Sequence, residues 1–466
     1  MTRAPRGFRP GETVLVIGVG RSGFATAEVL RARGIAVAAY DDKPYSQLCD
    51  ERRALSQIGV QLLDKGAFSD ALKSAKDAVV SPGVPLTNPA VQQLLAAGVT
   101  VSSEIEIAYQ LCAAPLIAIT GSKGKSTTTA LVGHLLRTAG KPVRVGGNIG
   151  NPLIRETVAA TADEWVVAEV SSFQLEGIHA FSPRIAVLLN ISPDHLDRYP
   201  SMQAYADAKF RIFKNQQPDD LFVGNLDDPY CAALAGDSGR LRSRALWFGM
   251  DPSDPRADAT CADGRLLLRI NQKLEPLVTV SAMQLRGRHN VQNALAASLA
   301  ALHAGVGLEA LRAGLASFEP LRHRLTVVHQ ESGVTWIDDS KATNPDAAIR
   351  ALEAFNAPII LIAGGKSKKT DFAEFAAVAG QRAKLIVLIG EAAPEIAAQV
   401  RGTSVAFAGS LAEAVESARR ASVPGDVVLL SPACASFDMF ASAEQRGDLF
   451  AELAQGRSPA SGVVAS

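Results

Sequence analysis

The sequence predicts an α/β protein of three domains, each with a mostly parallel, doubly wound sheet. Short apolar runs alternate with helix-length segments along the chain, as expected for buried parallel strands joined by crossover helices. This alternation starts again near Ala114 and near Pro320. A chain of 466 residues is also too long for one typical domain. We therefore expect domains at 1–112, 113–320 and 321–466.

The apolar runs that should form strands come in three groups. In the first domain they are "VLVIGVG" (14–20), "IAVAAYDD" (35–42) and "DAVVSPGV" (77–84). In the second they are "PLIAIT" (115–120), "EWVVAEVSS" (164–172) and "RIAVLLNIS" (184–192), with a β-rich periphery near 215–285. In the third they are "VTWIDDS" (334–340), "PIILIAGG" (358–365), "KLIVLIG" (384–390), "VAFAG" (405–409) and "DVVLLSPACAS" (426–436). The small, polar tail from 456 to 466 is expected to be disordered.

The composition argues against several classes of function. The 47 basic and 47 acidic residues cancel, so the chain has no global field for nucleic acid or an anionic membrane. The N-terminus "MTRAPRGFRPGE" lacks an apolar segment and no run of about 18 apolar residues occurs, so we expect neither export nor a membrane span. Five cysteines without a CxxC pair are typical of reduced thiols in the cytoplasm.

A glycine motif follows the first predicted strand. "GVGRSG" (18–23) fits G-x-G-x-x-G, opens a helix, and is followed about twenty residues later by Asp41 and Asp42. Backbone N–H groups at such a helix N-terminus can approach a pyrophosphate, which only glycine permits. The motif alone favours NAD(P), a nucleotide sugar would use the same loop, and glycines that serve only a tight turn are the third possibility.

"TGSKGKSTTT" (120–129) is the strongest single motif. It lies between a predicted strand and a predicted helix, and its Gly-Lys-Ser supplies a cradle, a cation for the β- and γ-phosphates and a hydroxyl for Mg²⁺. The general P-loop has a glycine where this chain has Ile119, so the loop is a shorter variant that begins at Gly121. We therefore expect an ATP phosphate site here.

Two residues at expected strand ends could complete a magnesium site. Glu169 ends an apolar run, and a carboxylate at a neighbouring strand end commonly holds the metal of an ATP site. His195 lies in the loop "NISPDHLDRY" after the next strand. Glu169 could instead face solvent, and His195 could be a structural histidine. With Ser126 on an adjacent strand end, we interpret both as metal ligands.

Together these elements resemble the Mur ligase family, whose members form amide bonds with ATP in peptidoglycan synthesis. The resemblance spans nearly the whole chain. It rests on "GSKGKST", "NIGNP" (148–152), "EVSSFQLE", "DHLDRY", "GRHNVQNALAA" (287–297), "LRHRL" (321–325), "DDSKATN" (338–344), "GGKSKK" (364–369) and "SPACASFDMF" (431–440). "SSFQLE", "DDSKATN" and "SPACASFD", in that order, are most similar to the D-glutamate-adding branch.

The resemblance implies a function for each domain. The first would be Rossmann-like and bind UDP-N-acetylmuramoyl-L-alanine rather than NAD, through Gly20, Arg21, Ser22, Gly23, Asp41, Asp42 and Asn148. The middle one would be a P-loop ATPase-type domain. The last would be Rossmann-like and bind D-glutamate through Lys341, Thr343, Lys368, Ser436 and Phe437. ATP contacts would come from Gly121, Ser122, Lys123, Gly124, Lys125, Ser126, Thr127, Asn290, Asn293, Arg324 and Asp339. The catalytic residues would be Lys125, Glu169, His195 and Lys209.

Lys209 lies in "YADAKFRIF" (205–213), which is similar to the family's helix whose lysine is carbamylated by CO₂. Sequence alone would favour a lysine that pairs with Asp194 or with a phosphate oxygen. Carbamylation needs a neutral amine, which burial favours. The carbamate would join Ser126, Glu169 and His195 as a metal ligand. The resemblance thus implies ATP and two Mg²⁺ ions as cofactors, with a carbamylated Lys209.

One segment departs from the D-glutamate-adding pattern. Ala441 and Ala443 in "ASAEQRG" (441–447) replace a cation and an aromatic ring at the rim of the amino-acid pocket. A related Mur-type ligase that adds another amino acid, such as L-glutamate, is therefore the alternative. Relatives acting on L-alanine, L-lysine, diaminopimelate or folate are further ones.

Two rivals come from other functional classes. A dehydrogenase with an appended P-loop domain would leave the phosphate loop, Glu169, His195 and "DDSKATN" unused. A non-catalytic relative would be expected to lose Lys125, Glu169 or His195, all of which are present. We expect a cytoplasmic monomer that acts on small molecules, with no nucleic-acid partner and no membrane insertion.

Overall fold

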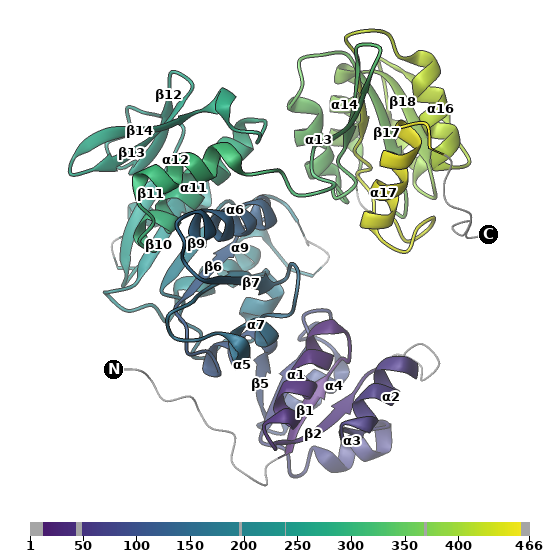
Figure 1. Cartoon of the computed structure of the whole chain (residues 1–466). Coiled ribbons are helices and arrows are strands. Elements are labelled where there is room, and N and C mark those ends of the chain that lie inside the picture. Colours follow the sequence, from purple (N-terminus) through teal and green to yellow (C-terminus); the bar gives the residue numbers. More distant parts are fainter. Residues whose placement is uncertain (1–12, 43–48, 195–197, 238, 368–370, 458–466) are drawn as a thin grey trace. The chain divides into compact units, whose positions relative to one another are not determined.

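The structure, a computed structural model, describes residues 13–42, 49–194, 198–237, 239–367 and 371–457. These residues form three β-sheets (Figure 1). The chain divides into two compact units, Met1–Met283 with Val291–Phe318 and Gln284–Asn290 with Glu319–Ser466. The first two sheets belong to the first unit and the third sheet belongs to the second. None of the described helices is long and apolar enough to cross a membrane.

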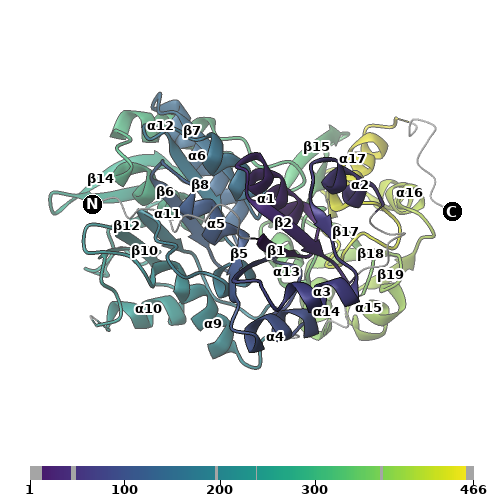
Figure 2. The ribbon, with the colours of Figure 1, turned by 90° about the horizontal axis from the view of Figure 1, so that it is seen from below.

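The first sheet is parallel and has helices on both faces. Its elements are β1 (Thr13–Ile17), α1 (Arg21–Ala32), β2 (Ala36–Tyr40), α2 (Cys49–Gln57), β3 (Gln61–Leu62), α3 (Lys65–Ala71), β4 (Asp77–Val80), α4 (Pro89–Ala96), β5 (Thr100–Ser103) and α5 (Glu104–Gln110). The strand order is β3-β2-β1-β4-β5. Figure 2 shows β1 and β2 between α1 and α2 on one side and α3 and α4 on the other. Alternate residues of β1 therefore enter different cores, Val14 and Val16 on one face and Leu15 and Ile17 on the other.

The central sheet places the ends of three neighbouring strands together. Its elements are β6 (Leu116–Thr120), α6 (Lys125–Thr138), β7 (Val143–Gly147), α7 (Leu153–Ala159), β8 (Trp165–Glu169), α8 (Ser172–Glu176), β9 (Ile185–Leu188), α9 (Met202–Phe210), η2 (Arg211–Phe213), β10 (Leu221–Asn225), α10 (Pro229–Ala235), β11 (Arg244–Phe248), β12 (Ala259–Ala262), β13 (Arg265–Ile270), β14 (Lys273–Thr279), η3 (Val280–Ala282), α11 (Arg288–His303) and α12 (Leu308–Ser317). The order is β14-β13-β12-β11-β10-β9-β6-β8-β7, with β12, β13 and β14 paired antiparallel and the other pairs parallel. Because β9, β6 and β8 are parallel neighbours, the residues after them meet at one edge.

The third sheet forms the second unit. Its elements are β15 (Thr326–Glu331), β16 (Val334–Asp338), α13 (Pro345–Glu353), β17 (Ile359–Gly364), α14 (Ala373–Arg382), β18 (Ala383–Ile389), α15 (Ala393–Gln399), β19 (Ser404–Phe407), α16 (Leu411–Ala421), β20 (Val427–Leu430) and α17 (Ala443–Ala454). The order is β15-β16-β20-β17-β18-β19, and β15 is antiparallel to β16. Figure 1 shows α13 and α14 on one side of β17 and β18, and α16 and α17 on the other. Two apolar cores, one on each face, result.

The predicted α/β class with mostly parallel sheets is confirmed. Each predicted apolar run contains a strand, and the periphery near 215–285 contains β10 to β14. The sequence patterns did not indicate β3, β5, β7 and β15. The segments "TVSS" of β5 and "VRVGG" of β7, for example, have few apolar residues. The domain boundaries at 112 and 320 stay predictions; they fall between α5 and β6 and between α12 and β15.

Candidate active site

The glycine loop after β1 is shaped by close backbone approaches. Gly18 has a φ of +83°, a conformation that favours glycine. A Cβ on Gly23 would lie 1.9 Å from the carbonyl oxygen of Gly18, so no larger residue fits there. Gly20, just before α1, would have no described atom within 4 Å of such a Cβ. With Ser22 in the first turn of α1, the loop leaves space at Gly20 where backbone N–H groups can approach an anion.

Asp41 and Asp42, the acidic pair after β2, have different partners. Asp41 Oδ2 accepts a hydrogen bond from the N–H of Val19 at 2.8 Å and so stabilises the glycine loop. Asp42 accepts hydrogen bonds from the Tyr40 hydroxyl at 2.8 Å and from the Asn88 amide at 2.7 Å. Burial, followed by the hydrogen bond to Asp42, raises the pKa of Tyr40 to about 12. The structure therefore brings Asp41 next to the glycine loop, and its contact with a nucleotide stays a prediction.

The phosphate loop runs from β6 into α6. Gly124 has a φ of +84° at the N-terminus of α6. A Cβ there would lie 2.2 Å from Oδ1 of Asn293, so this side chain of α11 lies directly against the loop. The ammonium of Lys125 donates hydrogen bonds to the carbonyls of Gly121 and Ser122 at 2.8 and 2.9 Å. The fold therefore brings together the phosphate loop and Asn293, which are far apart along the chain.

The segment after β9 anchors the phosphate loop. The N–H of Lys123 donates to Asn190 Oδ1 at 2.9 Å, and its ammonium pairs with Asp194 at 3.3 Å. The hydroxyl of Ser122 donates to the carbonyl of Ser192 at 3.0 Å. The segment after β9 therefore contacts the phosphate loop, and the sequence continues from it to His195, the predicted metal ligand.

Two predicted site residues, His195 and Lys368, lie outside the described residues. Ser126 and Thr127 lie in the first turn of α6, after Lys125, which directly follows the glycine that precedes this helix. Thr127 is buried there. Ser126, whose hydroxyl we expect to bind Mg²⁺, thus lies at the end of the helix where backbone N–H groups can bind phosphate.

Glu169 ends β8 beside the phosphate-loop strand. It lies opposite Ile119 of β6 in the parallel register. Its Oε1 accepts a hydrogen bond from the amide of Asn148 at 2.7 Å, and Asn148 N–H donates to the carbonyl of Glu169 at 2.9 Å. Its Oε2 is buried and has no hydrogen-bond partner among the described residues. In the same loop as Asn148, the carbonyl of Gly150 accepts a hydrogen bond from the Arg21 guanidinium.

Lys209 is buried at the end of α9, with 1% of its surface exposed. Its ammonium nitrogen donates to the carbonyl of Gly121 at 2.9 Å and lies 4.6 Å from the ring centre of Tyr205. Burial, and then the charge of Lys125, lower the pKa of Lys209 well below its usual value, although Asp194 and Glu169 act in the opposite direction. The site therefore favours the neutral amine.

In the second unit, Asp339 is held at the end of β16. Its N–H donates to the carbonyl of Leu430 at 2.8 Å, and its Oδ2 accepts a hydrogen bond from Ser431 at 2.9 Å. Burial raises the pKa of Asp339 to about 7, while Ser431 and Arg324 act in the opposite direction. Asn290 donates its own amide hydrogen bond to the carbonyl of Arg286 at 2.7 Å.

The predicted amino-acid contacts lie in the loops after β16 and β20. The ammonium of Lys341 pairs with Glu444 at 2.5 Å, and this hydrogen bond is the main reason that the pKa of Glu444 falls to about 2. The N–H of Thr343 donates to the carbonyl of Lys341 at 2.9 Å. Ser436 is buried, whereas Phe437 is 67% exposed.

Sequence patterns did not indicate His323 or Arg446 as site residues. His323 has a φ of +62°, and its Nδ1 lies 2.6 Å from Asp338 Oδ2. A Cβ on Gly447 would lie 2.2 Å from that nitrogen, so the start of α17 packs against His323. Arg446 is completely buried. The motifs "LRHRL" and "EQRG" contain these residues, but nothing in either motif indicates that their side chains are buried.

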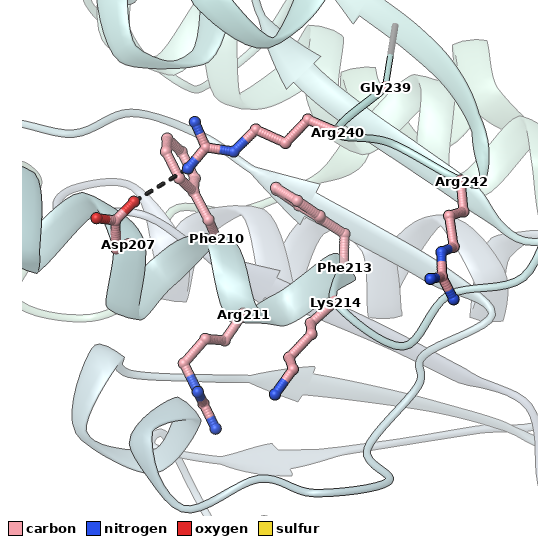
Figure 3. A pocket seen from close by; sticks show the side chains of 8 residues that line it. All are labelled: Asp207, Phe210, Arg211, Phe213, Lys214, Gly239, Arg240 and Arg242. Carbon is pink, nitrogen blue, oxygen red and sulfur yellow. Dashed lines mark hydrogen bonds and ion pairs between the residues drawn. The ribbon is translucent and has the colours of Figure 1, made fainter. Parts of the chain in front are cut away.

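A cavity of about 370 Å³ lies beside α9 and η2 (Figure 3). In Figure 3, Arg240 points toward Asp207, whereas Arg211, Lys214 and Arg242 point away from it. Arg240 pairs with Asp207 at 3.0 Å, and Arg211 donates to two backbone carbonyls of the protein. Because Arg240 and Arg211 are thus engaged by groups of the protein itself, we do not interpret this cavity as a ligand site. Its lining residues are Asp207, Phe210, Arg211, Phe213, Lys214, Gly239, Arg240 and Arg242.

Three family models match the chain. "Mur ligase MurD-like, N-terminal domain" matches residues 12–103, "Mur ligase middle domain" matches 119–301, and "Mur ligase, glutamate ligase domain" matches 323–434. Together these ranges account for well over half of the chain.

Similar proteins extend over nearly the full length. A UDP-N-acetylmuramoylalanine--D-glutamate ligase of Pelotomaculum thermopropionicum is 44% identical over 448 residues, which cover 94% of this chain and 96% of that protein. A protein of the same name from Koribacter versatilis is 42% identical over 444 residues, covering 95% and 97%. A pseudomurein peptide ligase type C from Methanothermus fervidus has a TM-score of 0.59 at 19% identity, covers 90% of this chain and 96% of its own, and so shows the fold.

Proposed function

The chain belongs to the Mur ligase family, and we propose that it joins D-glutamate to UDP-N-acetylmuramoyl-L-alanine with ATP in peptidoglycan precursor synthesis. It is an amide-forming ligase, as the members of this family are. The observation that carries the choice of D-glutamate is the 44% identity to a D-glutamate ligase over 94% of the chain. We further propose that it acts as a monomer in the cytoplasm.

Amide formation from a carboxylate needs a better leaving group. Transfer of the ATP γ-phosphate to the L-alanyl carboxylate gives an acyl phosphate and ADP. The amine of D-glutamate then attacks the acyl carbon, loses a proton and displaces phosphate. Two anions must approach each other in the first step, so positive charge is needed. We propose that Lys125 supplies it in the phosphate loop, and that Gly121 to Thr127, Asn290, Asn293, Arg324 and Asp339 contact ATP.

The residues beside the phosphate loop fit Mg²⁺. Glu169 has a buried carboxylate oxygen without a hydrogen-bond partner in the described part of the chain, and Mg²⁺ prefers oxygen ligands. Among the described residues no three His, Cys, Asp or Glu side chains gather into a ready-made cage. His195 lies outside those residues, and Mg²⁺ would take further ligands from ATP phosphates. Bound there by Ser126, Glu169 and His195, Mg²⁺ would neutralise developing phosphate charge.

Lys209 is proposed to join this set as a carbamate. An ammonium would repel the metal, whereas the burial and the lowered pKa of Lys209 favour the neutral amine that reacts with CO₂. The carbamate is an anion with two oxygens, which suits a second Mg²⁺. These observations support the proposal independently of the family resemblance.

The glycine loop of the first sheet is proposed to bind the UDP part of the substrate. Open space at Gly20 and the helix N-terminus at Arg21 suit a diphosphate, with Ser22 and Gly23 beside it. Asp41 or Asp42 would contact the uridine, and Asn148 the muramoyl part. D-Glutamate has two carboxylates, and we propose that Lys341, Thr343, Lys368, Ser436 and Phe437 form its pocket.

The test is ADP release with UDP-N-acetylmuramoyl-L-alanine and a panel of amino acids. D-Glutamate should be preferred over L-glutamate, which presents the same two carboxylates in mirror-image geometry. It should also be preferred over D-glutamine, since a pocket built to pair charges rejects the neutral analogue by up to roughly 10⁴-fold. Comparable rates with L-glutamate would overturn the assignment, with Ala441 and Ala443 as the first residues to examine. Titration with NADH should show no binding. Saturable binding would instead identify the glycine loop as a dinucleotide-binding site.

A further inference from the structure

The first turn of α17 contains a guanidinium group that is completely buried. Arg446 is 0% exposed. Its Nε donates to Ser340 Oγ at 2.9 Å, and its Nη2 donates to the carbonyls of Ser340 at 2.9 Å and Cys434 at 3.2 Å. Its Nη1 lies 3.4 Å from the carbonyl of Ala435. All these acceptors belong to the loops that follow β16 and β20.

A third loop, after β17, meets at the same place. A Cβ on Gly365 would lie 2.3 Å from the carbonyl oxygen of Ala435 and 3.2 Å from Nη1 of Arg446. The N–H of Lys366 donates to the same carbonyl of Ala435 at 2.9 Å. Arg446 therefore lies where three loops at the ends of parallel strands are in contact.

The charge of Arg446 is costly to keep in this position. Burial lowers the pKa of Arg446 to about 10, which still leaves the guanidinium charged at neutral pH. A buried cation loses its hydration, and an apolar side chain of similar volume is often as stabilising or more so. A retained charge with carbonyl and hydroxyl acceptors therefore points to a role in loop geometry rather than in core stability alone.

The loops that Arg446 joins carry the proposed amino-acid contacts. Ser340 directly precedes Lys341, and Ala435 directly precedes Ser436. Ser340 Oγ also donates to the carbonyl of Ala443 at 2.7 Å, so the start of α17 is connected to the loop from its backbone as well. A shift of the guanidinium would move both contacts at once.

We propose that Arg446 is a positioning residue for the amino-acid substrate, fixing the loops after β16 and β20 so that Lys341 and Ser436 meet its carboxylates. Arg446 does not itself contact the substrate. The identity of that substrate rests on the function proposed above, whereas the ordering of the loops does not.

The kinetic test compares Arg446→Met and Arg446→Lys in the full chain. For Arg446→Met, KM for D-glutamate should rise on the order of 10- to 100-fold, since misplacement by about 1 Å has such effects. KM for the UDP substrate should stay unchanged. Arg446→Lys keeps the charge but not the fork of donors, so it should fold and show a smaller rise. A role in stability alone would reduce the amount of active enzyme and so lower kcat, with KM unchanged.

Hydrogen exchange gives a readout that does not depend on activity. The amides of Lys341 and Lys366, which donate to the carbonyls of His323 and Ala435, should exchange faster in both variants, while those of β18 stay protected. If the wild-type protein does not turn over D-glutamate, the proposed function fails, and exchange at these amides still decides the role of Arg446.

Arg419 offers the matched control. It donates to the carbonyls of Leu453 and Ala454 at the other end of α17, at 2.9 and 3.0 Å, and its guanidinium lies 4.8 Å from the ring centre of Trp336. Arg419→Met should lower stability without raising KM for D-glutamate or exposing Lys341. Unchanged KM and unchanged exchange in a folded Arg446 variant, or equal effects in Arg419→Met, would overturn the proposal.

Discussion

Two buried basic side chains, Lys209 in the first unit and Arg446 in the second, respond to burial differently. Both are at most 1% exposed. The amine of Lys209 donates to the carbonyl of Gly121, and its pKa falls well below the usual value. The pKa of Arg446 falls only to about 10, and its guanidinium donates to acceptors in two loops. One site favours the loss of a proton, and the other keeps the charge.

The difference follows from the chemistry of the two cations. An ammonium is a compact charge that needs strong hydration, so burial readily neutralises it. A guanidinium spreads its charge over a planar fork whose donors can each meet a fixed acceptor. A lysine is therefore suited to a place where a neutral, reactive amine is needed, and an arginine to a place where loops must be held. Substitutions at or near these sites test this distinction.

The largest expected effect comes from exchanging the cation type at Lys209. Lys209→Arg should lose on the order of 10²- to 10³-fold in turnover, because a guanidinium stays charged when buried and cannot form a carbamate. Lys209→Ala should be similarly slow, and acetate or formate should restore part of its activity by occupying the carbamate's place. The measurement is the rate of ADP release with each added anion.

The alternative role of Lys209 as a charge partner predicts the reverse pattern. An active Lys209→Arg enzyme, or rescue of Lys209→Ala by small amines rather than carboxylates, would contradict the carbamate. NMR with ¹³C-labelled bicarbonate adds a direct readout, since the wild-type protein should give a carbamate signal that Lys209→Ala lacks.

A buried acid, Glu104, extends the comparison to the opposite charge and should have a smaller effect. It is 1% exposed, and its Oε1 accepts the N–H of Ile154 at 2.7 Å. Its Oε2 has no hydrogen bond of normal geometry among the described residues, and the nearby Gln174 acts to lower the pKa of Glu104. Burial raises the pKa of Glu104 from 4.5 to about 7. The folded state therefore keeps a proton that the unfolded chain loses, so stability falls as the pH rises from 4.5 towards 7 and then levels off.

Glu104→Gln should remove this part of the pH dependence, which amounts to about 3 kcal/mol at most. Calorimetric melting of both proteins at pH 5 and pH 8 measures it as the difference between their shifts in Tm. Asp339, whose pKa is also raised, is present in both proteins and cancels. Equal shifts in the two proteins would show that Glu104 is not held protonated.

The smallest expected effect concerns the ion pair of Lys341 and Glu444. Their side chains are 33% and 54% exposed, so the pair should contribute at most about 1 kcal/mol. In Glu444→Gln the ammonium of Lys341 no longer has this carboxylate as a competitor for the substrate. KM for D-glutamate should fall by at most about fivefold, the equivalent of that energy.

Glu452→Gln, an exposed change on the same helix, is the control and should leave KM unchanged. A rise of KM in Glu444→Gln would instead show that the acid holds Lys341 in place, which would add Glu444 to the positioning role argued for Arg446.

Strands were predictable because buried parallel strands are continuous apolar runs, as in "LIAIT" of β6 and "IILIAG" of β17. The position of the glycine loop between β6 and α6, and that of Glu169 at the end of β8, were predictable because glycine spacing and a charge at the end of an apolar run are local features. The hydrogen bond between Asn148 and Glu169, and the contact of Asn293 with Gly124, depend on strand order and could not be predicted from local patterns.

Arg446 shows the limit most clearly. A charged residue in a helix is normally assigned to the solvent face, and "AEQRG" contains nothing that indicates otherwise. Its guanidinium is buried against the carbonyls of Ser340 and Cys434. Ser340 is far from Arg446 in the sequence, and the two carbonyls come together only when β16 pairs with β20. The close approach of His323, which has a positive φ, to Gly447 likewise joins residues that are far apart in the sequence.

The position of β20 has a consequence for synthesis of the chain. Of the strands in the described residues it is the last to be made, yet it lies between β16 and β17. At about 5–20 residues per second, both neighbours leave the ribosome seconds before the strand that separates them. During that interval their facing edges present unpaired N–H and C=O groups, which readily pair with other chains. A nascent chain that stalls or is truncated before Val427 keeps these edges, and it should aggregate rather than persist as a partly folded enzyme.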